Sequence, residues 1–399
     1  MRFKKIFGWL HLWLGLVSGT IVFIISITGA IYSWEPELSE YTEPYRHVTP
    51  KDQPFQPVTA IRAAGEASMG GEKAFRILYR GKDQAAVVQF FQKNPYHYYN
   101  VYVNPYTAKV QKVLNRDDEF FHFILNGHMY LWLPREIGDV IVGYGTLVFF
   151  LVLVTGIVLW WPRNKARRKV SFRIKLNASP KRRNYDLHNV LGFYASWIVA
   201  FAALTGLVWS FTWMAQAEFW VFSGGKKRPG AVPVKSDNHA PVKDSTSINQ
   251  VFEAFLARYP NAAGYSISLP ANDSAAVIVR AYPSPNQFYN ADYLYFDQHT
   301  GREIPAPYLG KYQNATLAEK AVRMNYDIHV GSIAGLPGRL LMFFAALIAA
   351  SLPITGFLVW WGRRKKKKPA SRPVNKMSAV SGTPAKPINY QSPGRLHTP

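Results

Sequence analysis

The stretch HLWLGLVSGTIVFIISITG, residues 11–29, recurs in pattern as HNVLGFYASWIVAFAALTG at residues 188–206. Each copy begins with a histidine, has a glycine four residues later and ends in Thr-Gly, so that the three features keep one register. A histidine in a membrane helix is costly and is by default a functional hypothesis. Two histidines at matched positions, His11 and His188, indicate that both bind one common group between two helices.

Four apolar runs are long enough to cross a bilayer, which takes roughly 20 residues in a helix. They are residues 6–34, 137–161, 187–213 and 340–361, and each is nearly free of charge and ends in tryptophan, as expected at a membrane interface. The first run follows R-F-K-K but is too long for a cleaved signal peptide, so we interpret it as a retained anchor. The sequence therefore predicts a mainly α integral membrane protein with a four-helix bundle.

The net charge of +23 has a topological explanation. Segments 1–10, 162–185 and 363–399 contain 3, 10 and 10 Lys and Arg residues and no acidic residue, which accounts for the whole excess. The positive-inside rule places these segments in the cytoplasm, with both termini. We therefore expect a bacterial inner-membrane protein that contacts lipid and has no nucleic-acid partner.

The two remaining segments, 35–136 and 214–339, have matching patterns. A helical stretch (57–69 in one, 248–259 in the other) is followed in each by β-rich runs and a tight turn, which predicts two small α+β modules in the periplasm. The order helix–module–helix thus occurs twice, joined by a basic cytoplasmic loop at 162–186, and indicates a tandem duplication. The tail, 362–399, is rich in Pro, Ser and Lys and is expected to be disordered.

A second pair of histidines, His128 and His329, precedes the second and fourth spans, with Pro134 and Pro337 expected to interrupt the chain between histidine and span. These two are expected to face each other near the periplasmic leaflet. Each span also contains one Thr-Gly pair: Thr28-Gly29, Thr155-Gly156, Thr205-Gly206 and Thr355-Gly356. Glycine lets helices approach closely, so the pairs serve either helix packing or the accommodation of planar macrocycles.

Two histidine pairs, one near each face of a four-helix bundle, match bis-imidazole ligation of two b-type haems. The absence of cysteine excludes iron–sulfur clusters and covalent c-type haem. Histidines that only reach for interfacial water, and a zinc site, are the alternatives. His122 is a further candidate ligand beside His128, although Arg323 has its spacing in the second half. Arg135 and Arg339 either pair with haem propionates or are ordinary interfacial arginines.

The chain resembles the PepSY-associated transmembrane helix family, which includes iron-regulated membrane proteins and dihaem ferrisiderophore reductases. The resemblance covers about residues 1–365 and rests on the H-x-x-x-G entry motifs, on LVTGIVLWWPR (153–163) and on DIHVGSIAGLPGR (327–339). It implies that the external segments are PepSY-like modules. It also implies that His11 and His188 ligate one haem iron, and that His128 and His329 ligate the other.

For reductase members of the family, the resemblance implies transmembrane electron transfer. A cytoplasmic reductase or a quinol would supply electrons, and a periplasmic ferric siderophore would receive them and release Fe(II) for uptake. Nothing in the chain matches a flavin or nicotinamide fingerprint, so the reducing equivalents must come from a partner. Two alternatives stay open, namely a non-catalytic regulator whose PepSY modules bind peptides, and a ferrisiderophore permease.

Overall fold

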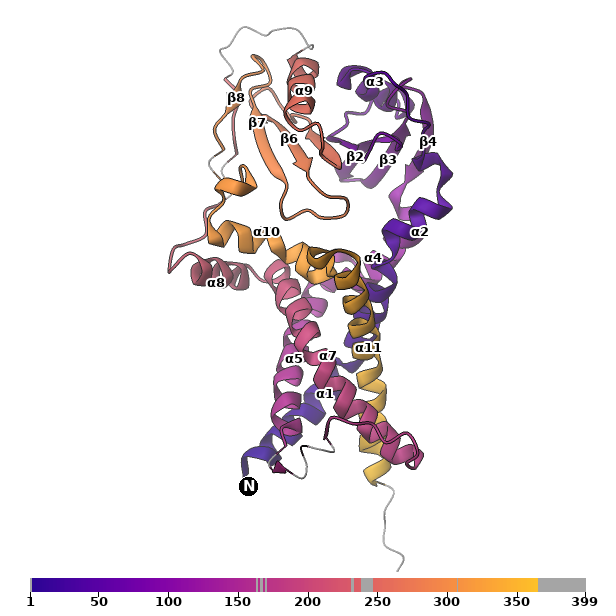
Figure 1. Ribbon diagram of the computed structural model, residues 1–399, viewed down its shortest axis with the longest axis vertical. Coiled ribbons are helices and arrows are strands. Elements are labelled where there is room, and N and C mark those ends of the chain that lie inside the picture. The colour runs from indigo at the N-terminus through magenta and orange to yellow at the C-terminus, as the bar shows by residue number, and fades with distance from the viewer. Residues whose placement is uncertain are drawn as a thin grey trace, which may run out of the picture.

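Four long helices form the tall part of the molecule, and a sheet lies across one end of them (Figure 1). The computed structural model describes residues 2–162, 164–165, 168, 171–230, 233–237, 247–306 and 308–364. His239 and His397, which from their polar surroundings are expected to be ordinary surface residues, lie outside these residues, as does the tail beyond Arg364 that is predicted to be disordered. The long helices are α1 (Arg2–Tyr32), α5 (Arg135–Trp160), α7 (Pro180–Ser210) and α11 (Gly335–Arg364). In the described residues these four are long and apolar enough to cross a membrane, which confirms the predicted membrane helices.

The helix ends differ in places from those expected. α7 begins at Pro180, inside the segment predicted as a loop, because proline suits a first turn, where its missing N–H needs no partner. Pro337 does not interrupt the chain before the last span, since it too lies in a first turn, that of α11. Trp213 belongs to a separate helix, α8 (Thr212–Phe222), because the backbone is extended at Phe211.

The bundle has a closed square arrangement. α1 packs against α5 and α11, and α7 packs against the same two helices, so that α1 and α7 stand on a diagonal. A small apolar core fills the centre and is made by Val22, Phe149, Val152, Leu153, Ala195, Val199, Ala345 and Ala349. Large apolar side chains such as Trp9, Tyr144, Trp197 and Phe344 are exposed on the outside. This is the distribution expected of a bundle that lipid surrounds.

The strands of both predicted modules form one antiparallel sheet of eight strands, in the order β4-β3-β2-β1-β5-β6-β7-β8. The first half contributes β1 (Arg76–Tyr79), β2 (Ala86–Lys93), β3 (Tyr96–Val103) and β4 (Val110–Asn115). The second contributes β5 (Gly264–Ser268), β6 (Val277–Tyr282), β7 (Asp292–Phe296) and β8 (Glu303–Ile304). The halves join because β1 and β5, each an open edge of its own meander, pair with each other and place Ile77 opposite Ile267.

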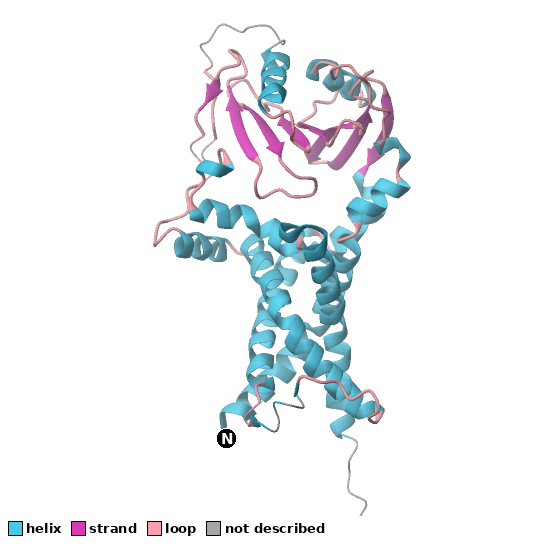
Figure 2. Ribbon diagram, viewed as in Figure 1, coloured by secondary structure: helices cyan, strands magenta, loops and turns pink. Residues whose placement is uncertain are grey.

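The sheet has two unlike faces. Helices α3 (Val58–Ser68) and α9 (Ser247–Arg258) cover the face that points away from the bundle (Figure 2). Alternate residues of each strand pack beneath these helices in one core, which includes Ile77, Phe90, Phe255, Ile267 and Val279. The intervening residues point toward the bundle and are more polar.

Short helices connect the sheet to the membrane helices. α4 (Phe120–Tyr130) precedes α5, and α10 (Leu317–Val330) precedes α11, while α2 (Glu35–Thr42) follows α1. α10 begins with a capping box, in which Thr316 and Glu319 bond each other's backbone N–H. It ends at Gly331, whose φ of 83° favours glycine and whose Cα lies so close to the carbonyl of Gly338 that a side chain would clash. These turns place the C-terminal ends of α4 and α10 over the bundle.

The joint between the two halves should be important for stability. Replacing Ile267 by alanine removes a fully buried side chain from the β1–β5 joint, and we expect a loss of about 2–5 kcal/mol in the free energy of unfolding. Thermal or denaturant unfolding of the purified protein in detergent measures it. Val113→Ala on β4, where the side chain is 39% exposed, is the control and should cost less than about 1 kcal/mol. Equal effects would show that the joint is not a cooperative part of the core.

Candidate functional site

The four membrane-associated histidines lie in two pairs. His11 of α1 and His188 of α7 face each other across the diagonal of the bundle, with ring centroids 6.3 Å apart and planes at 74°. We call them the distal pair, since they lie toward the end opposite the sheet. His128 of α4 and His329 of α10 form the sheet-side pair, with centroids 6.0 Å apart and planes at 69°. The structure therefore brings together the same partners that the sequence paired.

Each imidazole lies against the glycine of a Thr-Gly pair on a neighbouring membrane helix, and three of the four also contact the threonine. Nδ1 of His11 lies 3.1 Å from the carbonyl oxygen of Val152 and 3.1 Å from Oγ1 of Thr155, both on α5. A Cβ placed on Gly156 would stand 3.1 Å from Cε1 of the same ring. The threonine, the carbonyl three residues before it and the glycine after it thus form a seat for one imidazole.

His329 and His188 have comparable seats. Nδ1 of His329 lies 2.9 Å from the carbonyl oxygen of Ala202 and 3.0 Å from Oγ1 of Thr205. On α11, Oγ1 of Thr355 is 3.0 Å from Nδ1 of His188. A Cβ on Gly356 would lie 3.0 Å from Cε1 of that ring.

His128 has a variant of the seat. Its Nδ1 lies 2.7 Å from the carbonyl oxygen of Ile25, and a Cβ on Gly29 would approach its Cε1 to 2.9 Å. The hydroxyl of Thr28, however, donates to the carbonyl of Ile24 in its own helix at 2.6 Å. The seat of His128 thus keeps the carbonyl and the glycine but lacks the contact to the threonine hydroxyl.

These contacts give the Thr-Gly pairs a role that the sequence analysis missed. Helix packing and room for a macrocycle were the two roles considered, whereas the structure uses the pairs to seat imidazoles. One feature of the sequence pointed to this role: the number of Thr-Gly pairs in the spans equals the number of histidines at or near the ends of the spans. Their mutual contact could not be read from the sequence, because each histidine sits on a different helix from its Thr-Gly pair.

The seats determine which ring nitrogen is free. A carbonyl oxygen only accepts hydrogen bonds, so a neutral imidazole beside it carries its proton on Nδ1 and keeps a lone pair on Nε2. In the described part of the chain no hydrogen bond involves Nε2 of His11, His128, His188 or His329. An imidazole oriented by a carbonyl at one nitrogen, with the other nitrogen available, is the usual state of a metal ligand.

The spacing of each pair suits a single metal ion. A metal bound to two imidazoles from opposite sides lies about 2 Å from each nitrogen, which sets the ring centroids about 6 Å apart, as observed in both pairs. Among the described residues no cluster of three or more His, Asp or Glu is placed to hold a metal. Each pair therefore offers two protein ligands, which is fewer than the four of a closed zinc site.

The two pairs lie in separate layers of the bundle. α1 contains His11 of the distal layer and Thr28, whose neighbours seat His128, in the sheet-side layer. These residues are 17 positions apart, which corresponds to about 26 Å along a helix. Burial lowers the pKa of His128, and burial together with His128 lowers the pKa of His329 to about 4, so both rings of the sheet-side pair are neutral at pH 7.

The remaining candidates lie outside both pairs. His122 is buried on α4, with Nδ1 2.8 Å from the carbonyl of Arg116 and 3.3 Å from Oδ1 of Asp117. Arg135 is exposed and stacks over the ring of Tyr130 at 5.7 Å. His122 thus joins α4 to the segment that follows β4. Arg135, the first residue of α5, contacts Tyr130, the last residue of α4.

Arg339 is engaged within the protein. Its guanidinium forms an ion pair with Glu37 of α2, in which Nη2 lies 2.6 Å from Oε2, and it also donates to the carbonyl of Ser33. The contact joins the start of α11 to the end of α1, across the two halves of the chain. Arg339 therefore has a structural partner in Glu37. To pair with a haem propionate, its guanidinium would have to contact the propionate and Glu37 together.

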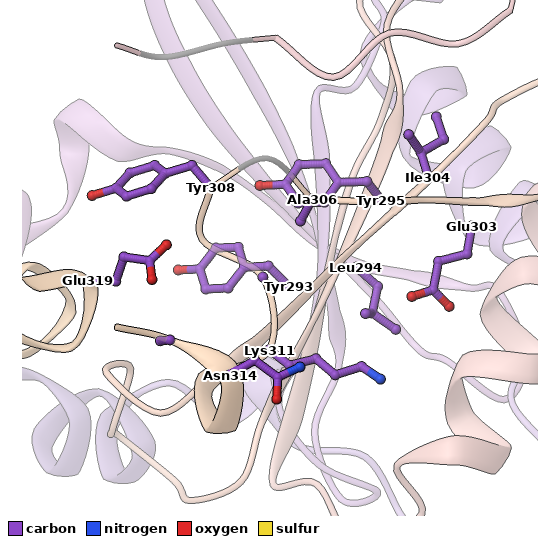
Figure 3. A pocket seen from close by; sticks show the side chains of 12 residues that line it. Tyr293, Leu294, Tyr295, Glu303, Ile304, Ala306, Tyr308, Lys311, Asn314 and Glu319 are labelled. Carbon is purple, nitrogen blue, oxygen red and sulfur yellow. The ribbon is translucent and has the colours of Figure 1, made fainter. Parts of the chain in front are cut away.

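A separate polar cavity of about 320 Å³ lies at the β7–β8 side of the sheet. Its lining includes the rings of Tyr293, Tyr295 and Tyr308, with Lys311 and Glu319 beside them (Figure 3). Tyr293 and Tyr295 come from the face of β7 that points toward the bundle, since Leu294 and Phe296 belong to the core on the other face. The cavity thus lies between strands β7 and β8 and the start of α10, whose Glu319 also lines it.

Comparison with known proteins identifies one family. The model of the PepSY-associated TM region matches residues 8–363. This match includes all four long helices and both halves of the sheet. A search of curated proteins found no match.

The seat can be tested without any cofactor. Thr205→Val keeps the shape of the side chain but removes Oγ1 from Nδ1 of His329, whereas Thr28→Val removes a hydroxyl that bonds only its own helix. We expect Thr205→Val to lower the free energy of unfolding by about 1 kcal/mol more than Thr28→Val does. Thermal unfolding in detergent gives the difference. Identical losses would mean that the imidazole contact contributes nothing to stability.

Proposed function

The chain belongs to the PepSY-associated TM family, and from this membership and the imidazole geometry we propose that it is a ferric-chelate reductase of the inner membrane with two b-type haems. The observation that carries the proposal is the presence of two imidazole pairs, each spaced for one metal ion, at opposite ends of one bundle. One haem would be held by His11 and His188, the other by His128 and His329.

The donor set fits this group better than it fits a bare metal ion. Two imidazoles leave most of a metal's coordination positions without protein ligands, and in a haem the macrocycle itself fills those positions. A haem held in this way supplies one-electron transfer. The helices that carry the distal pair are apolar over most of their length, which suits a hydrophobic macrocycle.

The protein's own residues orient and tune the ligands. Each Nδ1–H donates to a carbonyl or lies against a threonine hydroxyl, which holds the ring plane and makes Nε2 a stronger donor to a metal. The seats hold the imidazole rings of the two pairs with centroids 6.3 and 6.0 Å apart.

The basic segments support a direction for the electrons. Segments 1–10, 162–185 and 363–399 carry the whole positive excess, so the distal pair would lie near the cytoplasm and the sheet would lie in the periplasm. A cytoplasmic reductase or a quinol would be the donor, and a ferric siderophore the acceptor. One quinol gives two electrons and two protons, which reduces two Fe(III) chelates to Fe(II). Siderophores bind Fe(II) far more weakly, and the iron is released.

Haem content is the first test. Purified protein should contain two haems per chain in a pyridine haemochrome assay, and His11→Ala/His188→Ala should lose one of them while retaining the other. His122→Ala is the matched control, because this imidazole is buried but lies outside both pairs. Protein without a Soret band, or a Soret band that persists when all four paired histidines are replaced, would rule the proposal out.

The two other functions predict different results. A permease would carry an intact chelate into proteoliposomes, whereas a reductase leaves the chelator outside and delivers ferrous iron to a trap on the same side. A peptide-binding regulator would show neither activity. Protein reduced with dithionite and mixed with a ferric chelate, under a ferrous-specific dye, distinguishes these cases.

A further inference from the structure

Two arginines lie together on the face of the sheet that points toward the bundle. Arg76 of β1 is paired with Ser268, and Arg280 of β6 is paired with Ser266, so the two arginines flank the same strand, β5. Their neighbours in sequence, Ile77 and Val279, are fully buried on the opposite face. Side chains alternate along a strand, and both guanidiniums therefore project into the space between sheet and bundle.

Neither arginine is neutralised by the residues that the structure describes. In the described residues no carboxylate lies within ion-pair distance of Arg76 or Arg280, and the Nε atom of each is buried without a hydrogen bond. Burial, and then the like charge of Arg280, lower the pKa of Arg76. Two half-buried like charges without partners are costly. A bound anion would remove this cost.

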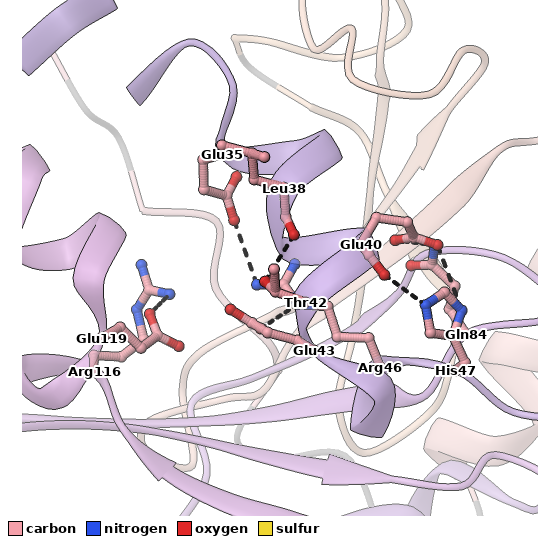
Figure 4. Close-up of polar contacts among 10 residues, drawn as sticks. All are labelled: Glu35, Leu38, Glu40, Thr42, Glu43, Arg46, His47, Gln84, Arg116 and Glu119. Atoms are coloured by element: carbon pink, nitrogen blue, oxygen red, sulfur yellow. Dashed lines mark hydrogen bonds and ion pairs between the residues drawn. The ribbon is translucent and has the colours of Figure 1, made fainter. Parts of the chain in front are cut away.

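Other buried arginines of the protein show the contrast. Arg46 lies between Glu43, at 2.6 Å, and Glu35, at 3.4 Å, and Arg116 pairs with Glu119 (Figure 4). Arg323 of α10 is held instead by the backbone carbonyl oxygens of Ala291 and Gly310. Each of these arginines thus has an oxygen partner in the fold, whereas the described residues offer Arg76 and Arg280 no hydrogen bond or ion pair, which points to a ligand.

Aromatic rings line the same space. Arg280 stacks over Tyr293 at 5.0 Å, and Arg323 of α10 stacks over the same ring at 5.2 Å. Tyr293 also lines the cavity of about 320 Å³ at this side of the sheet (Figure 3). Arginines held on aromatic faces keep their planar N–H forks oriented for oxygen ligands.

A continuous series of rings links this surface to the sheet-side pair. His329 contacts Trp209 at 5.1 Å between centroids, Trp209 contacts Tyr326 at 6.4 Å, Tyr326 contacts Phe288 at 5.2 Å and Phe288 contacts Tyr282 at 5.6 Å. Tyr282 is on the same face of β6 as Arg280. The buried carboxylate of Asp327 fixes the middle of the series, because it accepts from the backbone N–H of Phe288 and of Tyr289.

We propose that Arg76 and Arg280 bind the anionic oxygen groups of the ferric chelate, so that the substrates are negatively charged chelates such as carboxylate complexes. The inference rests on the proposed function, since it names the substrate class of that reductase. The bound ferric ion takes up one electron from the donor side and becomes ferrous, and no covalent bond forms or breaks. The ring series joins the face of β6 that carries Arg280 to His329 through packed side chains.

The test uses a chelate that cannot be reduced. Binding of gallium(III) citrate to the full-length protein, in nanodiscs of zwitterionic lipid, should weaken more than tenfold in Arg76→Gln/Arg280→Gln, because two charge-assisted hydrogen bonds are lost. Lys109→Gln/Arg302→Gln is the matched control. It removes the same charge from the equivalent exposed turns of the two halves, and its Kd should change less than twofold. Arg76→Lys/Arg280→Lys should restore part of the affinity.

Several outcomes would overturn the inference. An unchanged Kd in the arginine variant, or an equal loss of affinity in the control variant, would do so. Equal affinity of the protein for a positively charged gallium trihydroxamate would do so as well. Loss of citrate binding in nanodiscs that contain anionic lipid would assign the arginines to lipid headgroups. Haem content is measured on the same samples. If the haems are absent but the arginine-dependent binding persists, the reductase proposal fails while the anion site stands. If the haems are intact but the arginine variant binds gallium(III) citrate as tightly as the unmodified protein, the anion site fails while the reductase proposal stands.

Discussion

The hydrogen bond from imidazole Nδ1 to a helix carbonyl is the constraint on which the rest of the bundle depends. A histidine within an apolar bundle must satisfy its ring N–H, and the chain does so with the carbonyl that stands three residues before a threonine in the next helix. For His11, His128 and His329 this bond measures 3.1, 2.7 and 2.9 Å. It settles the tautomer and leaves Nε2 as the reactive nitrogen.

Glycine makes this bond possible. At Gly29, Gly156 and Gly356 a Cβ would come within about 3 Å of the ring, so a side chain there would hinder its approach, whereas at Gly206 the distance would be 3.5 Å, an ordinary contact. The same requirement sets how close the helices stand, and hence the separation of about 6 Å between paired rings. Bundle packing and the positions of the imidazoles therefore depend on the same residues, since a bulkier residue at Gly29, Gly156 or Gly356 would disturb both.

Much of this architecture can be predicted from the sequence, for physical reasons. The four spans follow from apolar length and from the placement of Lys and Arg, and the pairing of His11 with His188 follows from their common register. The fusion of both halves into one sheet was not predicted, because alternation in Arg76–Tyr79 defines a strand without defining its neighbour. Likewise Thr155 and Thr205 were noticed only as part of a repeat, since the contact to a histidine on another helix is long-range.

The charged residues show the same limit. Arg339 was a candidate for a propionate, and the structure pairs it with Glu37, which is 302 positions away. Arg76 and Arg280 drew no attention in the sequence, because a lone arginine in a strand has no distinguishing pattern. Their candidate role as an anion site appears only in the structure, where the β1–β5 joint places them on the two sides of one strand and no described carboxylate pairs with them.

The most direct measurement is anomalous X-ray scattering at the iron absorption edge from crystals of the purified protein. Two iron peaks are expected in the chain, one between the rings of His11 and His188 and one between those of His128 and His329. A map without a peak between either pair, or with iron at His122 instead, would contradict it.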